Sequence, residues 1–189
     1  MSARALPPRE AGSALLLLGL LTGICLVADP DASGGPLAPV TGAAILHAAL
    51  ISPAFAGNSP ARWGLAATLL SLPALAACSF GHPFPAAPLW CALLVVSASL
   101  AGCSARALEG RAIAHAYYPT MLLLLLAPFA CAYLVAEFGS GGDPAAWRRL
   151  SPLQAASGAQ GGSAPPALSL GLLLAWPALA AGLRPRRAP

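Results

Sequence analysis

Histidine and cysteine are the residues of this chain whose chemistry could bind haem or a metal ion. The three histidines are His47, His82 and His115. If the apolar segments described below are membrane helices, which rise about 1.5 Å per residue, His47 lies near mid-membrane, His82 in an outer turn and His115 near the inner end of a helix. No two share a depth, so a bis-histidine pair within one protomer is excluded. A ligand shared across a dimer, or a lone polar contact by His47, stays open.

The cysteines have no metal-binding or redox spacing. Their number is odd, there is no C-x-x-C, and all of them fall within apolar segments: Cys25, Cys78, Cys91, Cys103 and Cys131. Buried cysteine behaves as a small, polarizable apolar residue. We therefore expect no metal and no cofactor.

Catalytic combinations of side chains are also missing from the sequence. No apolar segment carries a pair of carboxylates, a His-Glu metal spacing, or a nucleophile with a base at its own depth. Proton- and ion-coupled carriers usually keep an ionisable group near mid-membrane, and these segments contain no Asp, Glu, Lys or Arg. The sequence predicts neither a self-contained enzyme nor a proton-driven carrier, and no nucleic-acid partner.

The composition explains why catalytic and charged side chains are scarce, because only 8% of the residues are charged and 58% are hydrophobic. A soluble domain has about a quarter of its residues charged. The chain is therefore predicted to be an integral membrane protein, with the lipid bilayer as its first partner.

Six apolar segments reach or approach the ~20 residues that a helix needs to cross the hydrocarbon core. The second, third and sixth are richer in alanine and interrupted by proline, which leaves a re-entrant path open for two of them. None contains Asp, Glu, Lys or Arg. The predicted fold is an all-α polytopic bundle forming a single membrane domain, residues 1–189, with spans at 11–28, 40–56, 63–80, 86–103, 112–136 and 167–183.

The arginines predict the orientation of these spans, because cytoplasmic loops are enriched in basic residues. With the amino terminus in the cytosol and six spans, eight arginines lie inside and only Arg148 and Arg149 lie outside. Five spans, the chief alternative, would put the cluster Arg184, Arg186 and Arg187 outside. Both termini are therefore predicted to be cytosolic.

The first segment also has features of a signal peptide, because Arg4 and Arg9 precede a Leu-rich core. The residues Cys25–Asp29 lack a small-x-small cleavage site, and Ile24 departs from the lipoprotein pattern. We expect the segment to be retained as an anchor.

The longest connection is the outer loop at 137–166. Within it, Ala145–Ala156 is expected to form short helices on the outer membrane surface, with Trp147 at headgroup level. Ser157–Pro166 is rich in Gly, Ser and Pro and is expected to be flexible. Aromatic residues at span ends are interpreted as interfacial anchors, namely Trp63, Trp90, Tyr117 and Tyr118, whereas Trp176 lies near the middle of the last span.

Four prolines fall inside the spans, and each removes a backbone donor and favours a kink. They are Pro53, Pro73, Pro128 and Pro177. Gly19 and Gly23 form a G-x-x-x-G, and Ala98 and Gly102 repeat this small-residue spacing, which allows helices to approach closely. Kinked helices are common in bundles, but a bundle that must bend or open would need them too.

Three stretches resemble the permease subunit of type-2 ATP-binding-cassette exporters. They are Leu89–Ala114, where a small-residue helix leads into a charged inner loop, the Leu-rich Tyr118–Val135, and Leu150–Ala156 followed by a last Leu/Ala span. The resemblance covers about the last 100 residues. It implies six spans, cytosolic termini, small helices in the outer loop between the fifth and sixth spans, and a cytosolic ATPase partner. Two features differ, because residues 1–10 are short for an elbow helix and Gly57–Arg62 is short for a coupling segment.

The function expected from these features is a transmembrane, permease-like subunit of an ATP-dependent exporter, acting on an apolar or amphipathic substrate. The alternative is a non-catalytic structural or assembly subunit of a larger membrane complex, since the helices are suited to tight packing in a homo- or hetero-oligomer. The candidate docking residues for a partner are Arg106, Glu109 and Arg111, because they form the inner loop with several charges. Setting topology at anionic headgroups would explain the same charges.

Overall fold

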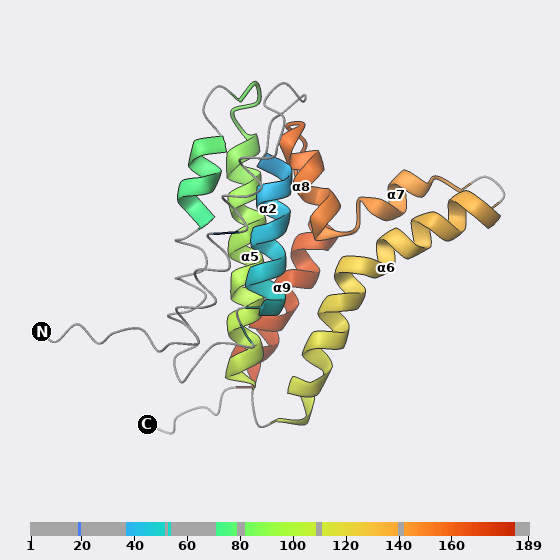
Figure 1. The fold of residues 1–189 in the computed structure, drawn as a ribbon. Helices are drawn as coiled ribbons and strands as arrows, with labels where there is room; N and C mark the ends of the chain where they lie inside the picture. Colours follow the sequence, from blue (N-terminus) through green and yellow to red (C-terminus); the bar gives the residue numbers. More distant parts are fainter. Residues whose placement is uncertain are drawn as a thin grey trace, which may run out of the picture.

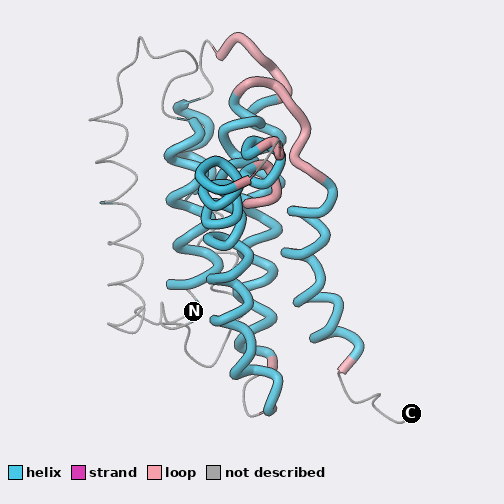
Figure 2. Tube along the Cα trace, turned by 90° about the vertical axis from the view of Figure 1, so that its right-hand side faces the viewer, coloured by secondary structure: helices cyan, strands magenta, loops and turns pink. Residues whose placement is uncertain are grey.

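The computed structural model describes residues 19, 37–51, 53, 71–78, 82–108, 111–139 and 142–183. These residues are helical with connecting turns, and none of them is in a strand, which confirms the all-α class (Figures 1 and 2). Residues 71–78 form a helical stretch. The other elements in chain order are α2 (Leu37–Leu46), the π-helical turn η1 (His47–Ile51), α5 (Ala87–Ala107), the 3₁₀ turn η2 (Ala112–Ala116), α6 (Tyr117–Phe138), α7 (Pro144–Arg148), α8 (Pro152–Gln160) and α9 (Ala167–Gly182).

Two of the described helical segments are long and apolar enough to cross a membrane, Ala87–Ala105 and Ala112–Phe138. They match the predicted spans 86–103 and 112–136. Leu37–Ile51 and Ala167–Gly182 are apolar but shorter, and they overlap the predicted spans 40–56 and 167–183. The predicted span 11–28 lies outside the described residues apart from Gly19, and 63–80 is described only at 71–78.

The helix α5 forms the centre of the bundle and packs against α9, α2 and α8. Small and branched side chains on its inner face are fully buried, including Leu94, Val95 and Ala98. Over the candidate spans, 56% of α5 is buried inside the protein but only 17% of the segment containing α6. An apolar helix at the edge of the bundle thus presents most of its surface outward.

The helices α2 and α5 run in the same direction. The Thr41 side chain of α2 lies close to Cys91 in the first half of α5, and Gly102, late in α5, lies against Ala48 and Pro53, which follow α2.

The helix α6 runs opposite to α9. Its first residue, Tyr117, lies against Trp176 late in α9, whereas Leu125 further along α6 is linked through Ser151 to the level of Ser169 at the start of α9. Beyond this point α6 bends away from the bundle, and α7 folds back along it (Figure 1).

The helix α8 differs from the surface helix expected within Ala145–Ala156. It packs against α2 and α5 and buries Ala155, Ala156 and Ala159. The Gln160 side chain at its end accepts a 2.7 Å hydrogen bond from the Ala38 N–H in the first turn of α2, a group that has no partner within its own helix. This buried alanine face explains why helix continues to residue 160, into the stretch expected to be flexible.

Candidate functional site

The predicted docking loop is described only in part. Arg106 lies in the last turn of α5, but its side chain and the whole of Glu109 are outside the described residues. Arg111 is half-buried and precedes η2. Its N–H donates to the Leu108 carbonyl at 3.0 Å, and its own carbonyl accepts from the Ala114 N–H at 2.9 Å. Partner docking by this loop stays a prediction.

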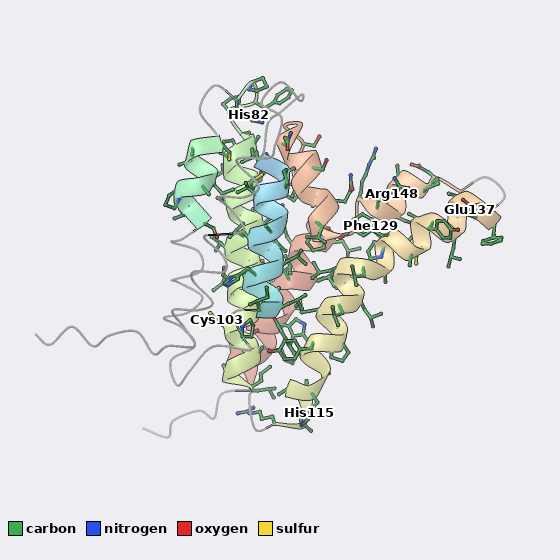
Figure 3. The ribbon with its side chains drawn as sticks, viewed as in Figure 1. His82, Cys103, His115, Phe129, Glu137 and Arg148 are labelled. Atoms are coloured by element: carbon green, nitrogen blue, oxygen red, sulfur yellow. The ribbon has the colours of Figure 1, made fainter. Side chains whose placement is uncertain are left out.

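The three histidines are far apart in the fold. His82 and His115 lie at opposite ends of the bundle (Figure 3), and His47 is 2% exposed within η1. The positions of His82 and His115 agree with the separation predicted for these two residues. Among the described residues, no group of three or more His, Cys, Asp or Glu side chains could hold a metal ion.

Near two of the prolines, side-chain hydroxyls from other segments donate hydrogen bonds to backbone carbonyls. Pro53 follows Ala49 by four residues and has no N–H, so the Ala49 carbonyl loses its α-helical donor. The Tyr117 hydroxyl donates a 2.7 Å hydrogen bond to this oxygen from the first turn of α6. Tyr117 is fully buried, and its bond therefore joins two segments inside the bundle.

The backbone next to this hydrogen bond is closely packed against α5. In a π-helix, residue i+5 donates to residue i, so Pro53 also leaves the Ala48 carbonyl without its π-type donor. Gly102 of α5 lies directly against that carbonyl, and a side-chain carbon at position 102 would collide with it. The small-residue spacing that ends at Gly102 thus serves a close approach between α5 and η1.

Two aromatic contacts orient the Tyr117 ring. Its centroid lies 5.1 Å from that of Trp176 and 5.3 Å from that of Tyr118, with edge-to-face angles of 73° and 85°. This is the geometry that aromatic pairs prefer. Tyr117 therefore belongs to the packed interior and not to an interfacial belt, contrary to the expectation from its place at a span end.

A second hydroxyl serves the bend of α6 around Pro128. This proline removes the donor for Leu124 and opens the turn before it. The Ser151 hydroxyl donates a 2.9 Å hydrogen bond to the next carbonyl, Leu125, and also accepts from the Leu153 N–H at 3.3 Å as the N-cap of α8. Phe129 lies where α6 turns away (Figure 3).

The remaining predicted packing and kink residues are placed as follows. Pro177 lies inside α9, and Pro73 lies in the helical stretch 71–78 with an exposed ring. A side-chain carbon on Gly19 would meet no atom within 4 Å, and Gly23 lies outside the described residues. Helix packing by the Gly19–Gly23 pair stays a prediction.

We call the Tyr117–Ala49 and Ser151–Leu125 hydrogen bonds the two hydroxyl bridges. Tyrosine and serine hydroxyls become nucleophiles when a neighbouring base activates them, whereas here each hydroxyl donates its proton to a backbone carbonyl. In a membrane, freed carbonyls are tolerated when neighbouring helices or side chains satisfy them. The two hydroxyl bridges therefore join separate segments of the bundle close to its prolines.

Comparison with protein-family profiles, curated proteins and solved structures finds no match to this chain. Over the residues that the structure describes, the fold is an all-helical bundle with two helices able to cross a membrane by length and composition.

Proposed function

We propose that the chain is a transmembrane, permease-like subunit of an ATP-dependent export complex. It would be a multi-pass protein of six spans with both termini in the cytosol, in the inner membrane if the cell is bacterial. The observation that carries the proposal is the path of the chain from α6 to α9. The long helix α6 bends near Pro128, two short helices follow, and α8 returns into the bundle before the last apolar helix.

This path supports export because it places a bent helix beside apolar spans. The predicted spans 86–103 and 112–136 contain no Asp, Glu, Lys or Arg, so they lack the charged side chains on which ion-coupled carriers usually depend. The work would come from a partner ATPase, and bent helices would supply the rearrangement. A bundle of this composition would accept an apolar or amphipathic substrate.

The partner ATPase would dock at the loop that contains Arg106, Glu109 and Arg111. Arg106 lies in the last turn of α5 and the other two residues follow it in sequence, and α5 contacts α2, α8 and α9. A movement imposed at this loop would therefore reach the centre of the bundle. Charge pairing with an acidic surface also fits its two arginines.

The test is co-expression of this protein with the ATPase encoded by a neighbouring reading frame that contains a Walker A motif. We expect the two proteins to co-purify, and replacing Arg106 and Arg111 together by alanine to abolish the association while leaving membrane insertion unchanged. The matched control is Arg186→Ala with Arg187→Ala, which we expect to weaken insertion or orientation and to keep the complex. Normal insertion with unchanged co-purification of the Arg106/Arg111 variant would show that the loop only sets topology.

The alternative, a structural or assembly subunit, is favoured by the exposed surface of α6. Leu123 is 64% exposed and Leu126 55% exposed, which would suit packing against helices of other subunits. The absence of any Walker A reading frame near the gene, together with failure of the purified chain to bind a nucleotide-binding protein, would support this reading over export.

A further inference from the structure

Two adjacent arginines lie at the carboxyl end of α7, where nothing described in the chain neutralises them. Arg148 and Arg149 are exposed, and neither forms an ion pair within the described ranges. Trp147 beside them is 43% exposed. The nearest acidic side chain along the chain, Asp143, is engaged at the other end of α7, where it accepts a 2.9 Å hydrogen bond from the Ala145 N–H.

The backbone at the arginine pair is held in place. The Ser169 hydroxyl of α9 donates to the Leu150 carbonyl at 2.8 Å and approaches the Arg149 carbonyl at 3.4 Å. The Arg149 N–H donates to the Ala145 carbonyl at 3.1 Å. The two arginines are thus presented from a fixed position, which reduces the entropy lost when they bind a ligand.

The helix α6, against which α7 packs, is apolar and outward-facing here. Tyr133 is 59% exposed and Leu134 54%. The acidic Glu137 lies toward the far end of α6, whereas Arg148 lies nearer the bundle (Figure 3). A surface with an apolar flank, an exposed tryptophan and two cationic groups matches the boundary between acyl chains and phosphate headgroups.

We propose that Trp147, Arg148 and Arg149 form a binding site for phospholipid phosphate groups with a preference for anionic lipids. The guanidinium groups would bind phosphate oxygens, for which their planar donors are well suited, and the Trp147 ring would lie at the same level. The site rests on the membrane placement proposed above. It adds to that placement a specific contact between the α6–α7 hairpin and the outer leaflet.

The test uses a variant of the full chain in which Trp147 is the sole tryptophan. The other three are replaced by Trp63→Phe, Trp90→Phe and Trp176→Phe, and the protein is reconstituted in vesicles. Fluorescence quenching is measured with brominated phosphatidylglycerol and brominated phosphatidylcholine. We expect stronger quenching with bromine near the headgroup than deep in the acyl chain, and a preference for phosphatidylglycerol of about fivefold or more. Arg148→Gln with Arg149→Gln should abolish the preference, whereas replacing both with lysine should retain it.

A single-tryptophan protein that keeps Trp176 is the control, because this residue is 8% exposed and packs on Tyr117. Its quenching should not depend on the headgroup or on the two arginines. Equal quenching of Trp147 by both lipids, or a preference that survives the glutamine variant, would overturn the lipid site alone. Absence of quenching by either lipid would contradict the membrane placement and with it the proposed function.

Discussion

At the scale of single residues, the structure explains why two hydroxyl side chains are buried in an apolar bundle. A buried carbonyl without a donor costs about 1–3 kcal/mol, and proline creates such carbonyls wherever it lies inside a helix. Tyr117 and Ser151 each donate to a carbonyl within one turn of a proline, at 2.7 Å and 2.9 Å. Each hydroxyl therefore has a hydrogen-bond acceptor in another segment of the chain, close to a proline.

Tyr117→Phe is expected to lower the free energy of unfolding by about 1–3 kcal/mol, because it leaves the Ala49 carbonyl without a donor. Pro53→Ala should restore an N–H four residues after Ala49, so the same Tyr117→Phe change should cost much less in that background. Denaturation with sodium dodecyl sulfate in mixed micelles would measure this double-mutant cycle. The matched control is Tyr133→Phe, since Tyr133 is 59% exposed. An equal loss in both backgrounds would show that Tyr117 does not compensate for Pro53.

At the scale of secondary-structure elements, α8 is the segment that joins the edge of the bundle to its centre. Ser151 at its start bonds to α6, and Gln160 at its end bonds to the first turn of α2. The alanine face between them packs on α2 and α5. A displacement of α6 would therefore be transmitted through α8 to the two parallel helices.

Ser151→Ala is expected to reduce stability by about 0.6–1.7 kcal/mol, the range found for hydrogen bonds between helices in membranes. It should also increase hydrogen exchange in α6 around Leu125, where the bond is lost. Ser157→Ala is the matched control on the same helix, because the Ser157 side chain is exposed. Identical exchange in the two variants would mean that Ser151 does not hold α6 to α8.

At the scale of the whole molecule, the described helices form one bundle with a weakly packed edge. The central helix α5 has 56% of its span buried, compared with 17% for the segment containing α6. In water this edge would be unfavourable, because it exposes large apolar side chains. In a bilayer the same surface faces acyl chains, and the hairpin of α6 and α7 would place its arginines at the headgroups.

Much of this fold could be predicted from apolar length and charge distribution. The spans at 86–103 and 112–136 match observed helices because long uncharged runs are little affected by tertiary contacts. The position of α8 could not be predicted, because its alanines are buried through packing with α2 and α5, which lie far earlier in the chain. The hydrogen bond from Tyr117 to the Ala49 carbonyl could not be predicted for a similar reason. Pro53 signals an unsatisfied carbonyl, but its local sequence does not show which distant hydroxyl will reach it.

The six-span topology is tested most directly by the accessibility of single cysteines to a membrane-impermeant thiol reagent in intact cells. In a chain without its native cysteines, one cysteine is placed at a time by His82→Cys, Arg111→Cys, Ala145→Cys or Ala188→Cys. We expect positions 82 and 145 to react from outside, and positions 111 and 188 only after the membrane is opened, because eight of ten arginines then lie on the cytosolic side. Labelling of position 188 in intact cells would contradict the cytosolic carboxyl terminus and the six-span arrangement.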